Sequence, residues 1–375
     1  MTDHRNVNHP ENDPAFTGLS VNKGIEQPDT VNADSVSRFL KKNLRKELTV
    51  KQYCEGILQG NRTILSRAVT LIESNKADHQ RMAQEIIGRC LPFSGNSVRI
   101  GITGVPGAGK STFIESFGTY LTAMGKKLAV LAIDPSSEKT KGSILGDKTR
   151  MEELSADPNA YIRPSPSSGS LGGVARKTRE TILLCEAAGF DTILIETVGV
   201  GQSETAVHSM VDFFLLLQIA GAGDELQGIK RGIMEMADTI VINKADGDNV
   251  LRAKTAATLY RNALHLFPPT ISGWIPQVKT CSSLRKTGMD EIIQCIDDYF
   301  DLVKGNNYFR ERRSSQSRFW MYETIDAQLK SDFYKNKMVK SSLSTMEKEV
   351  SSEKLSPFVA AQELLEKYFD SVGKH

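Results

Sequence analysis

One glycine-rich octapeptide constrains the fold of this 375-residue chain more than any other feature. Residues 104–111 read Gly-Val-Pro-Gly-Ala-Gly-Lys-Ser and match the pattern Gly-x4-Gly-Lys-Ser/Thr of a phosphate-binding loop. The apolar run Val98–Gly101 before it is typical of a short buried strand, and Phe113, Phe117 and Leu121 after it recur at helical spacing. Because the pattern is specific between a strand and a helix, the sequence predicts a nucleotide-binding protein with a P-loop.

The residue types of this loop suit the binding of phosphate groups. Glycines let the backbone curl so that successive N–H groups point at phosphate oxygens, and the helix that follows adds the positive end of its dipole. Lys110 is expected to reach the terminal phosphates, and the Ser111 hydroxyl is expected to ligate Mg²⁺. The candidate nucleotide-binding residues here are Gly104, Val105, Pro106, Gly107, Ala108, Gly109, Lys110, Ser111 and Thr112.

Strands and helices alternate from Ser97 onward. Helical segments are expected notably at Gly173–Ala188 and Val250–Leu266. Most of the strands are apolar runs without alternation, as expected when helices cover both faces of a sheet. Together they predict an α/β fold of the P-loop NTPase class, with a doubly wound, mostly parallel sheet and its ligand at the carboxyl ends of the strands. The expected strands are Val98–Ile102, Lys127–Ile133, Tyr161–Arg163, Thr192–Glu196, Phe213–Gln218, Thr239–Asn243 and Val278–Cys281.

The regions before and after this α/β domain are expected to be helical. Residues 1–33 are polar and predict a flexible tail, residues 34–94 an N-terminal helical region, and residues 95–305 the nucleotide-binding domain itself. Residues 306–375 predict a C-terminal helical region. The N-terminal helices are expected from Ala33 to about Leu44, then at Val50–Leu58, Arg62–Glu73 and Ala77–Cys90.

The C-terminal region leaves two interpretations open. Aromatic and aliphatic residues share one helical face, and a last helix is expected from Pro357 to Phe369. The helices either complete the core of one subunit or form a dimerisation arm. The shared face holds Phe319, Tyr322, Ile325, Leu329 and Phe333, and the residues expected to point inward from the last helix are Phe358, Ala361, Leu365 and Tyr368.

The composition excludes several function classes. The formal net charge of +2 gives no strong footprint for nucleic acid or anionic membranes, and no apolar run is long enough to span a bilayer. The five cysteines are scattered and never form a Cys-x-x-Cys pair, which argues against a disulfide framework or a structural zinc site. We therefore expect a cytoplasmic protein without nucleic-acid or membrane partners.

A second phosphate element follows the strand at Thr192–Ile195. Glu196-Thr197-Val198-Gly199 matches the acidic-x-x-Gly pattern that places a Mg²⁺-linked carboxylate and a glycine N–H near the γ-phosphate. Val200 stands where Ras-type enzymes have the glutamine that orients the attacking water. We therefore expect hydrolysis that is slow in isolation and completed by a partner, a second subunit or a loop rearrangement.

Two further carboxylates are candidates for Mg²⁺ or its water shell. Asp134 ends the strand at Lys127–Ile133, and Asp147 lies in the following loop. As alternatives, Asp134 is a turn residue before Pro135 and Asp147 is a helix cap. The candidate metal ligands are thus Ser111, Asp134, Asp147 and Glu196, and the candidate catalytic residues are Lys110, Glu196 and Asp134.

The strand at Thr239–Ile242 leads into a motif that selects guanine. In Asn243-Lys244-Ala245-Asp246, the Asp246 carboxylate can accept hydrogen bonds from guanine N1–H and N2–H₂, which adenine lacks. The stem of Lys244 can lie along the base, and Cys281-Ser282-Ser283 fits the small-residue loop whose backbone contacts guanine O6. Asn243, Lys244, Asp246, Cys281, Ser282, Ser283 and the phosphate-side Gly199 complete the candidate site for GTP or GDP.

Longer runs of the chain resemble one known family. Residues 133–137 (IDPSS), 144–147 (ILGD), 163–166 (RPSP), 171–174 (LGGV), 196–204 (ETVGVGQSE) and 223–230 (GDELQGIK) look like the MeaB/MMAA-type metallochaperone GTPases, also known as ArgK or LAO/AO transport kinases. The resemblance is dense from about Asn61 to Val303 and looser through the helical arms. The chain departs from the family at Lys139-Thr140-Lys141, where a less basic run is more common.

The resemblance implies a function and a set of partners. Such proteins serve the adenosylcobalamin-dependent methylmalonyl-CoA mutase, have a G domain of the class that includes signal-recognition and nickel-insertion GTPases, and work as homodimers. It implies that Lys110, Ser111, Asp134, Asp147 and Glu196 hold nucleotide and Mg²⁺. It also implies a switch I at about 135–150, a switch II at about 198–204 and an additional switch at 220–230, matched by Asp224, Glu225, Gln227 and Lys230.

On these grounds we expect a GTP-hydrolysing chaperone that gates the loading of adenosylcobalamin and the protection or reactivation of the mutase. One alternative is a nucleotide-dependent kinase or ATPase of an amino-acid (LAO/AO) transport system, against which the guanine motif argues. A second is a nickel-insertion GTPase, which usually carries a conspicuous His or Cys tract. A third is a structural dimer that binds nucleotide without turnover.

Overall fold

The computed structural model describes residues 48–133, 151–165, 171–197, 203–221 and 231–373. The chain divides into two units, residues 1–48 and 49–375, and the description that follows concerns the second. The expected tail and first helix, the expected switch I and most of the other two expected switches lie outside the described residues. The domain boundaries expected from the sequence stay a prediction.

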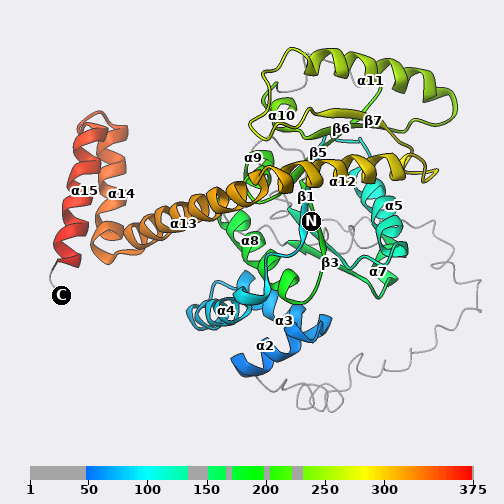
Figure 1. Ribbon diagram of the computed structural model, residues 1–375. Coiled ribbons are helices and arrows are strands. Elements are labelled where there is room, and N and C mark those ends of the chain that lie inside the picture. Colours follow the sequence, from blue (N-terminus) through cyan, green and yellow to red (C-terminus); the bar gives the residue numbers. More distant parts are fainter. Residues whose placement is uncertain (1–47, 134–150, 166–170, 198–202, 222–230, 374–375) are drawn as a thin grey trace, which may run out of the picture. The chain divides into compact units, whose positions relative to one another are not determined.

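Seven parallel strands form one sheet, which helices surround in Figure 1. The strand order is β3-β2-β4-β1-β5-β6-β7. The central strand β1 pairs with β4 on one side and β5 on the other, so that Gly101 lies opposite both Ile195 and Phe214. The predicted fold class is confirmed, and each expected strand is present. The strands are β1 Val98–Gly104, β2 Leu128–Ile133, β3 Ala160–Ser165, β4 Thr192–Thr197, β5 Phe213–Ile219, β6 Thr239–Asn243 and β7 Gln277–Thr280.

Helices cover both faces of this sheet. On one face, α5 (Lys110–Ala123) and α12 (Met289–Gly305) pack on β1 and β5. On the other face, α8, α9 and α11 contact the strands, as the packing of Val207 against Gly101 shows for α9. These helices and their short neighbours are α7 Glu152–Ala156, α8 Leu171–Ala187, α9 Ser203–His208, α10 Arg231–Met236 and α11 Val250–Leu264.

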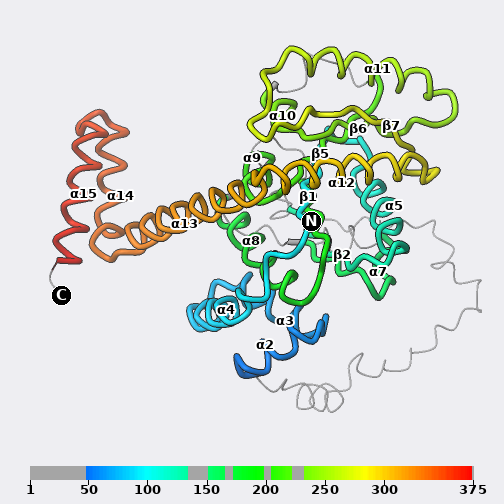
Figure 2. Tube along the Cα trace, in the orientation of Figure 1, coloured from blue at the N-terminus to red at the C-terminus, as the bar shows by residue number. Residues whose placement is uncertain are grey.

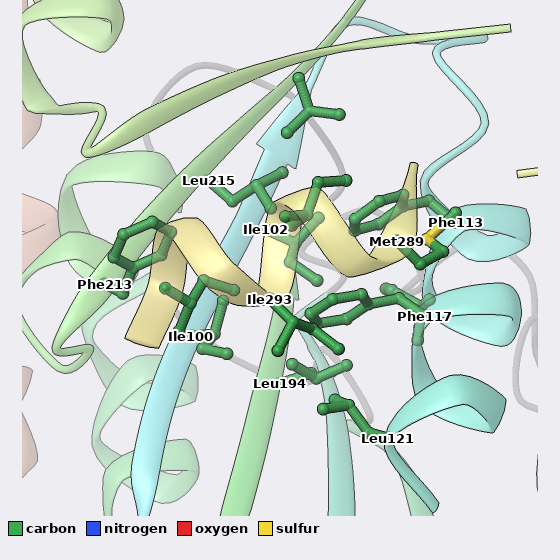
Figure 3. Close-up of a cluster of buried hydrophobic side chains, with 14 of the residues drawn as sticks. Ile100, Ile102, Phe113, Phe117, Leu121, Leu194, Phe213, Leu215, Met289 and Ile293 are labelled. Atoms are coloured by element: carbon green, nitrogen blue, oxygen red, sulfur yellow. The ribbon is translucent and has the colours of Figure 1, made fainter. Parts of the chain in front are cut away.

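A large buried cluster lies between the sheet and the face formed by α5 and α12. Figure 3 shows side chains of β1, β4, β5, α5 and α12 pointing into one layer, with the Phe113 and Phe117 rings of α5 stacked at a centroid distance of 5.3 Å. The labelled members of this layer are Ile100, Ile102, Phe113, Phe117, Leu121, Leu194, Phe213, Leu215, Met289 and Ile293. Because α5 begins directly at the P-loop, this packing holds the loop rigidly at the end of β1.

Three N-terminal helices pack together and against α8 (Figure 2). They are α2 Val50–Leu58, α3 Arg62–Glu73 and α4 Ala77–Cys90, with the bounds expected from the sequence. Thr49 and Gln52 form a capping box at the start of α2, and Asn61 caps α3 through its side-chain oxygen. An ion pair between Arg163 of β3 and Glu73 of α3 links this region to the sheet.

The C-terminal region consists of α13 (Tyr308–Lys335), α14 (Lys337–Ser351) and α15 (Pro357–Val372). The first turns of α13 are fixed to the α/β domain. Arg313 pairs with the buried Asp212 at 2.6 Å and donates to the carbonyl of Ser97, while Gln316 donates to the carbonyl of Val211 at 2.7 Å. Farther along, α14 and α15 pack side by side through Val339, Met346, Ala360 and Leu364.

The buried face expected for the last helix is wrong for three of its four residues. Phe358 is 86% exposed, Leu365 is 44% exposed, and Ala361 is also exposed. Ala360 and Leu364 point inward instead, because they meet Val339 and Met346 of α14, and only Tyr368 joins them as expected. The helix thus has two apolar faces, and periodicity alone does not tell which of them packs within the chain.

Candidate nucleotide site

The predicted site residues gather at the carboxyl edge of four neighbouring strands, in the order β4-β1-β5-β6. Glu196, one residue before the end of β4, lies opposite Ile102 of β1, and Gly104 ends β1. Asn243 ends β6 two strands away. Because all strands run in parallel, the phosphate elements and the base motif meet at one edge of the sheet.

Two glycines of the P-loop meet specific steric demands. A Cβ atom at Gly104 would lie 2.2 Å from the carbonyl oxygen of Leu217 on β5, so any side chain there would push the two strands apart. Gly109, at the N-cap of α5, has φ +85°, in the left-handed region that favours glycine. The loop can therefore turn sharply from β1 into α5 and present its N–H groups at the start of that helix.

The side chain of Lys110 folds back over the first residues of the P-loop. Its Nζ atom donates to the carbonyl oxygens of Gly104 at 3.0 Å and Val105 at 3.4 Å. Burial lowers the pKa of the Lys110 ammonium, while the nearby carboxylates of Glu196 and Glu204 oppose that shift. A lysine held in this way is placed to meet the phosphates of a nucleotide bound in the loop.

The Ser111 hydroxyl and the Glu196 carboxylate come together at 3.4 Å between Oγ and Oε1. Glu196 is only 9% exposed, and next to it Thr197 donates to Thr103 across β4 and β1 at 2.8 Å. Hydroxyl and carboxylate oxygens are ligands that Mg²⁺ accepts, so these two residues fit such an ion. The other predicted ligands, Asp134 and Asp147, and the predicted phosphate contact Gly199 lie outside the described residues.

Asn243 connects the P-loop with the predicted guanine loop. Its Nδ2 donates to the carbonyl of Ala108 at 2.9 Å, and its Oδ1 accepts from the Ser283 N–H at 3.1 Å and the Ser283 hydroxyl at 2.8 Å. The Cys281 thiol contacts the same oxygen at 3.5 Å. These bonds give Asn243 a positioning role between two loops, a role that the motif by itself did not reveal.

Asp246 is supported from the same guanine loop. Its Oδ2 accepts a hydrogen bond from the Ser282 hydroxyl, and the Ser282 Oγ in turn accepts from the Arg285 N–H at 3.1 Å. The backbone N–H of Ala245 donates to the carbonyl of Cys281 at 2.9 Å. The carboxylate is thus oriented by a neighbouring hydroxyl, while Lys244 next to it is exposed.

The Cys281 thiol is held in its neutral form by its buried surroundings. Burial raises its pKa to about 12, so the sulfur stays protonated at neutral pH. Cys281 acts as a small side chain that lets the loop pass close to β6. The predicted backbone contact between the Cys281-Ser282-Ser283 loop and guanine O6 stays a prediction.

Two residues near the site were given no individual role by the sequence analysis. Glu204, in the first turn of α9, is 2% exposed and close enough to oppose the lowering of the Lys110 pKa by burial. Ser116 of α5 donates to the carbonyl of Ser283 and so braces the guanine loop from the P-loop helix. A small polar residue inside an otherwise apolar helix face was the only sequence signal for Ser116.

Comparison with known proteins places these features in one family. A match to the family described as "Methylmalonyl Co-A mutase-associated GTPase MeaB" spans residues 65–338. The chain is 48% identical to the Escherichia coli protein named GTPase ArgK, over 77% of this chain and 88% of that protein. It is 43% identical to the mouse protein named methylmalonic aciduria type A homolog, mitochondrial, over 86% of this chain and 80% of that protein.

A solved structure agrees with these matches. The crystal structure titled LAO/AO transport system kinase superposes with a TM-score of 0.69 at 39% identity, over 86% of this chain and 99% of that one. The likeness extends across most of both chains and so includes more than the sheet and the P-loop. Among the described helices, none is long and apolar enough to cross a membrane.

Proposed function

The chain belongs to the MeaB family of GTPases, and from this premise we propose that it is a GTP-driven chaperone of methylmalonyl-CoA mutase. It binds guanine nucleotide and hydrolyses GTP, as the relatives named GTPases do. The finer proposal is that this cycle gates the loading of adenosylcobalamin into the mutase and the protection or reactivation of that enzyme. The names of the family and of the mouse relative support this assignment.

The observation that carries the nucleotide part of the proposal is the set of bonds around Asn243. They hold the P-loop and the guanine loop in one frame, in which Ser282 orients Asp246. Asp246 would accept the N1–H and N2–H₂ of guanine, and a site built on such bonds strongly rejects a base that lacks them. This favours GTP over ATP and speaks against an ATP-dependent transport kinase.

In the proposed mechanism, Lys110 and the P-loop N–H groups bind the β- and γ-phosphates. Ser111 and Glu196 would hold Mg²⁺, with Asp134 and Asp147 as further candidates, and the ion would neutralise charge that develops on the phosphates. The γ-phosphate would order the residues after Glu196, and its loss would release them. Because Val200 replaces the glutamine that orients water, we propose slow hydrolysis that the mutase accelerates.

We also propose that the protein acts as a homodimer. Four apolar side chains of α13 are between 45% and 62% exposed, namely Phe319, Tyr322, Ile325 and Leu329. They recur at helical spacing and form a continuous stripe, which a second copy of the chain would cover. The cytoplasm stays our expected compartment for this chain, whereas the mouse relative is named mitochondrial.

Exchange of the base-reading carboxylate tests the nucleotide assignment. Asp246→Asn replaces an acceptor by an amide that donates, which suits the additional carbonyl of xanthine in place of the guanine amino group. We expect GTP to bind at least about tenfold more weakly and XTP to bind more tightly than in the wild type. Competition against a fluorescent GDP analogue measures both, and unchanged guanine preference would contradict the role of Asp246.

Asp248→Asn is the matched control, because Asp248 lies two residues farther on in the same loop and is exposed. We expect this variant to keep the wild-type preference for GTP. A shift toward XTP in the control would mean that the charge of the loop, and not the Asp246 carboxylate, sets base selectivity.

A further inference from the structure

A cavity lies away from the nucleotide site, beside the amino ends of β6 and β7. Its walls come from residues 234–238 before β6, residues 264–276 before β7, His208 at the end of α9, and Tyr308 and Arg312 at the start of α13. The cavity has a volume of about 570 Å³. This volume is in the range of pockets that hold small organic molecules.

The wall of this cavity is mainly apolar. Aliphatic, aromatic and thioether side chains form most of it, and Trp274 is almost fully buried while its indole N–H donates to the carbonyl of Asp238 at 2.8 Å. Such a lining favours a ligand with an apolar body. The residues that provide it include Met234, Met236, Leu264, Phe267, Trp274 and Ile275.

One cation, Arg312, stands in this apolar wall. Among the described residues, its guanidinium donates to Nε2 of His208 at 3.2 Å, and no carboxylate oxygen lies within 4.0 Å of it. The adjacent Arg313 differs, because it is paired directly with Asp212. A guanidinium has five N–H donors in a planar fork, so Arg312 retains donors for a ligand.

The neighbours of Arg312 balance part of its positive charge but leave donors of its guanidinium fork unbonded. Burial, with help from Arg312, lowers the pKa of His208 to about 4, so the imidazole is neutral and can accept a hydrogen bond from the guanidinium. Burial raises the pKa of Asp238 to about 6 although Arg312 opposes the rise, so this carboxyl is mostly ionised at neutral pH and is the main counter-charge of Arg312. One of its oxygens accepts from the Phe214 N–H at 2.8 Å, and it forms no direct ion pair with the guanidinium. Glu235 also lines the cavity, but it is exposed to water.

We propose that this cavity binds a small organic anion, a carboxylate with an apolar body. The carboxylate would take the fork of Arg312 in a bidentate pair, and the apolar body would lie against Trp274 and the methionines before β6. The site is separate from the nucleotide site, since it lies at the opposite ends of the strands. The proposal goes beyond the chaperone function and does not depend on it.

Trp274 offers a direct readout for this proposal. The chain has two tryptophans, so Trp320→Phe leaves Trp274 as the sole indole, inside the cavity wall. Titration with hexanoate, 1-hexanol and hexylamine compares an anion, a neutral molecule and a cation of equal length. We expect a saturable change in Trp274 fluorescence with hexanoate. Its half-saturation concentration should be at least about tenfold lower than that of 1-hexanol or hexylamine.

Variants of α13 identify the residue that is responsible. Arg312→Gln is expected to weaken hexanoate binding at least about tenfold, and Arg312→Lys to weaken it less because the charge remains. The matched control is Arg318→Gln, on the same helix, exposed and outside the cavity lining. Binding of a fluorescent GDP analogue reports whether each variant is folded. If Arg312→Gln does not fold, Arg312→Lys serves as the test variant.

Three results would overturn the proposal. They are the absence of a saturable signal with hexanoate, equal affinity for hexanoate and 1-hexanol, and equal effects of the substitutions at Arg312 and Arg318. Hexanoate binding is measured without GTP and without the mutase. A protein that proved to lack GTPase activity or mutase binding could therefore still bind hexanoate, and failure of the cavity proposal is distinguishable from failure of the proposed function.

Discussion

At the scale of single residues, Asn243 shows how a motif residue can act through its neighbours. Its side chain bonds to Ala108 in the P-loop and to Ser283 in the guanine loop, and it is buried. The sequence predicted Asn243 as part of the nucleotide site from the pattern Asn-Lys-x-Asp. The pattern could not tell that its amide connects two loops, because the partners lie 135 and 40 residues away.

Asn243→Ala should weaken all nucleotides together. The substitution leaves the buried Ser283 N–H and Ala108 carbonyl without these bonds, at a cost of about 1–3 kcal/mol in unfolding free energy. We expect the affinity for GDP and XDP to fall by a similar factor of at least about ten, since the loops lose their common frame. Fluorescent-nucleotide titration and urea unfolding measure the two effects.

Asn249→Ala is the matched control, because Asn249 bonds to the carbonyl of Lys244 in the same loop but is not buried. It is expected to cost less than about 1 kcal/mol and to leave nucleotide affinity near the wild-type value. If Asn243→Ala changed the selectivity between GDP and XDP, the asparagine would read the base itself and the positioning role would be wrong.

His208 predicts a pH dependence of stability. Burial lowers its folded-state pKa from 6.5 to about 4, so below pH 6.5 the unfolded chain binds a proton that the folded chain does not. This group therefore costs stability as the pH falls from about 6.5 toward 4. The unfolding free energy of each protein is compared at pH 7.5 and pH 5. Its decrease between these two values should be roughly 1–2 kcal/mol smaller for His208→Gln than for the wild type.

Urea unfolding at the two pH values gives the comparison, and the exposed His265 provides the control variant His265→Gln. Carboxylates titrate in all three proteins and cancel in the difference. An identical pH response of wild type, His208→Gln and His265→Gln would show that His208 is not held neutral in the fold.

At the scale of elements, α13 is fixed at its start and exposed farther on. Arg313, Gln316 and Trp320 all bond to the α/β domain, and Trp320 donates to the carbonyl of Ser209 at 3.2 Å. Helix bounds such as Val50–Leu58 could be predicted because caps and periodicity are local. The buried face of α15 could not, because it depends on where α14 packs.

The exposed stripe of α13 should decide the oligomeric state. Tyr322→Glu combined with Leu329→Glu places two charges in an apolar contact, so we expect the dimer to separate into monomers. Light scattering coupled to size-exclusion chromatography measures the mass. Ala327→Glu with Gln328→Glu adds the same charge at exposed positions of the same helix outside the stripe, and we expect this control to stay dimeric.

A monomeric wild type, or a dimeric stripe variant, would contradict the role of the stripe. GTP hydrolysis without partner should be similar in the stripe variant and the control, because both leave the nucleotide site untouched. This comparison separates assembly from catalysis.

At the scale of the whole molecule, the α/β fold follows from one sequence feature and its repetition. The order of strand, loop and helix around Gly104–Ser111 repeats along the chain, with a buried strand between successive helices. Such a repeat gives parallel strands, whose carboxyl ends meet at one edge of the sheet. Strand order and the meeting of β1 with β5 could not be predicted, because they depend on long-range pairing. The cavity at Arg312 is hidden in the sequence for the same reason, since four separate segments form it.

Phosphate release from GTP, with and without purified methylmalonyl-CoA mutase, tests the proposed chaperone role most directly. We predict slow release by the protein alone and release at least about tenfold faster with the mutase. Asp246→Asn should show the same acceleration with XTP and little with GTP, which ties the effect to this nucleotide site. Equal rates with and without the mutase, together with no complex between the two proteins, would contradict the account.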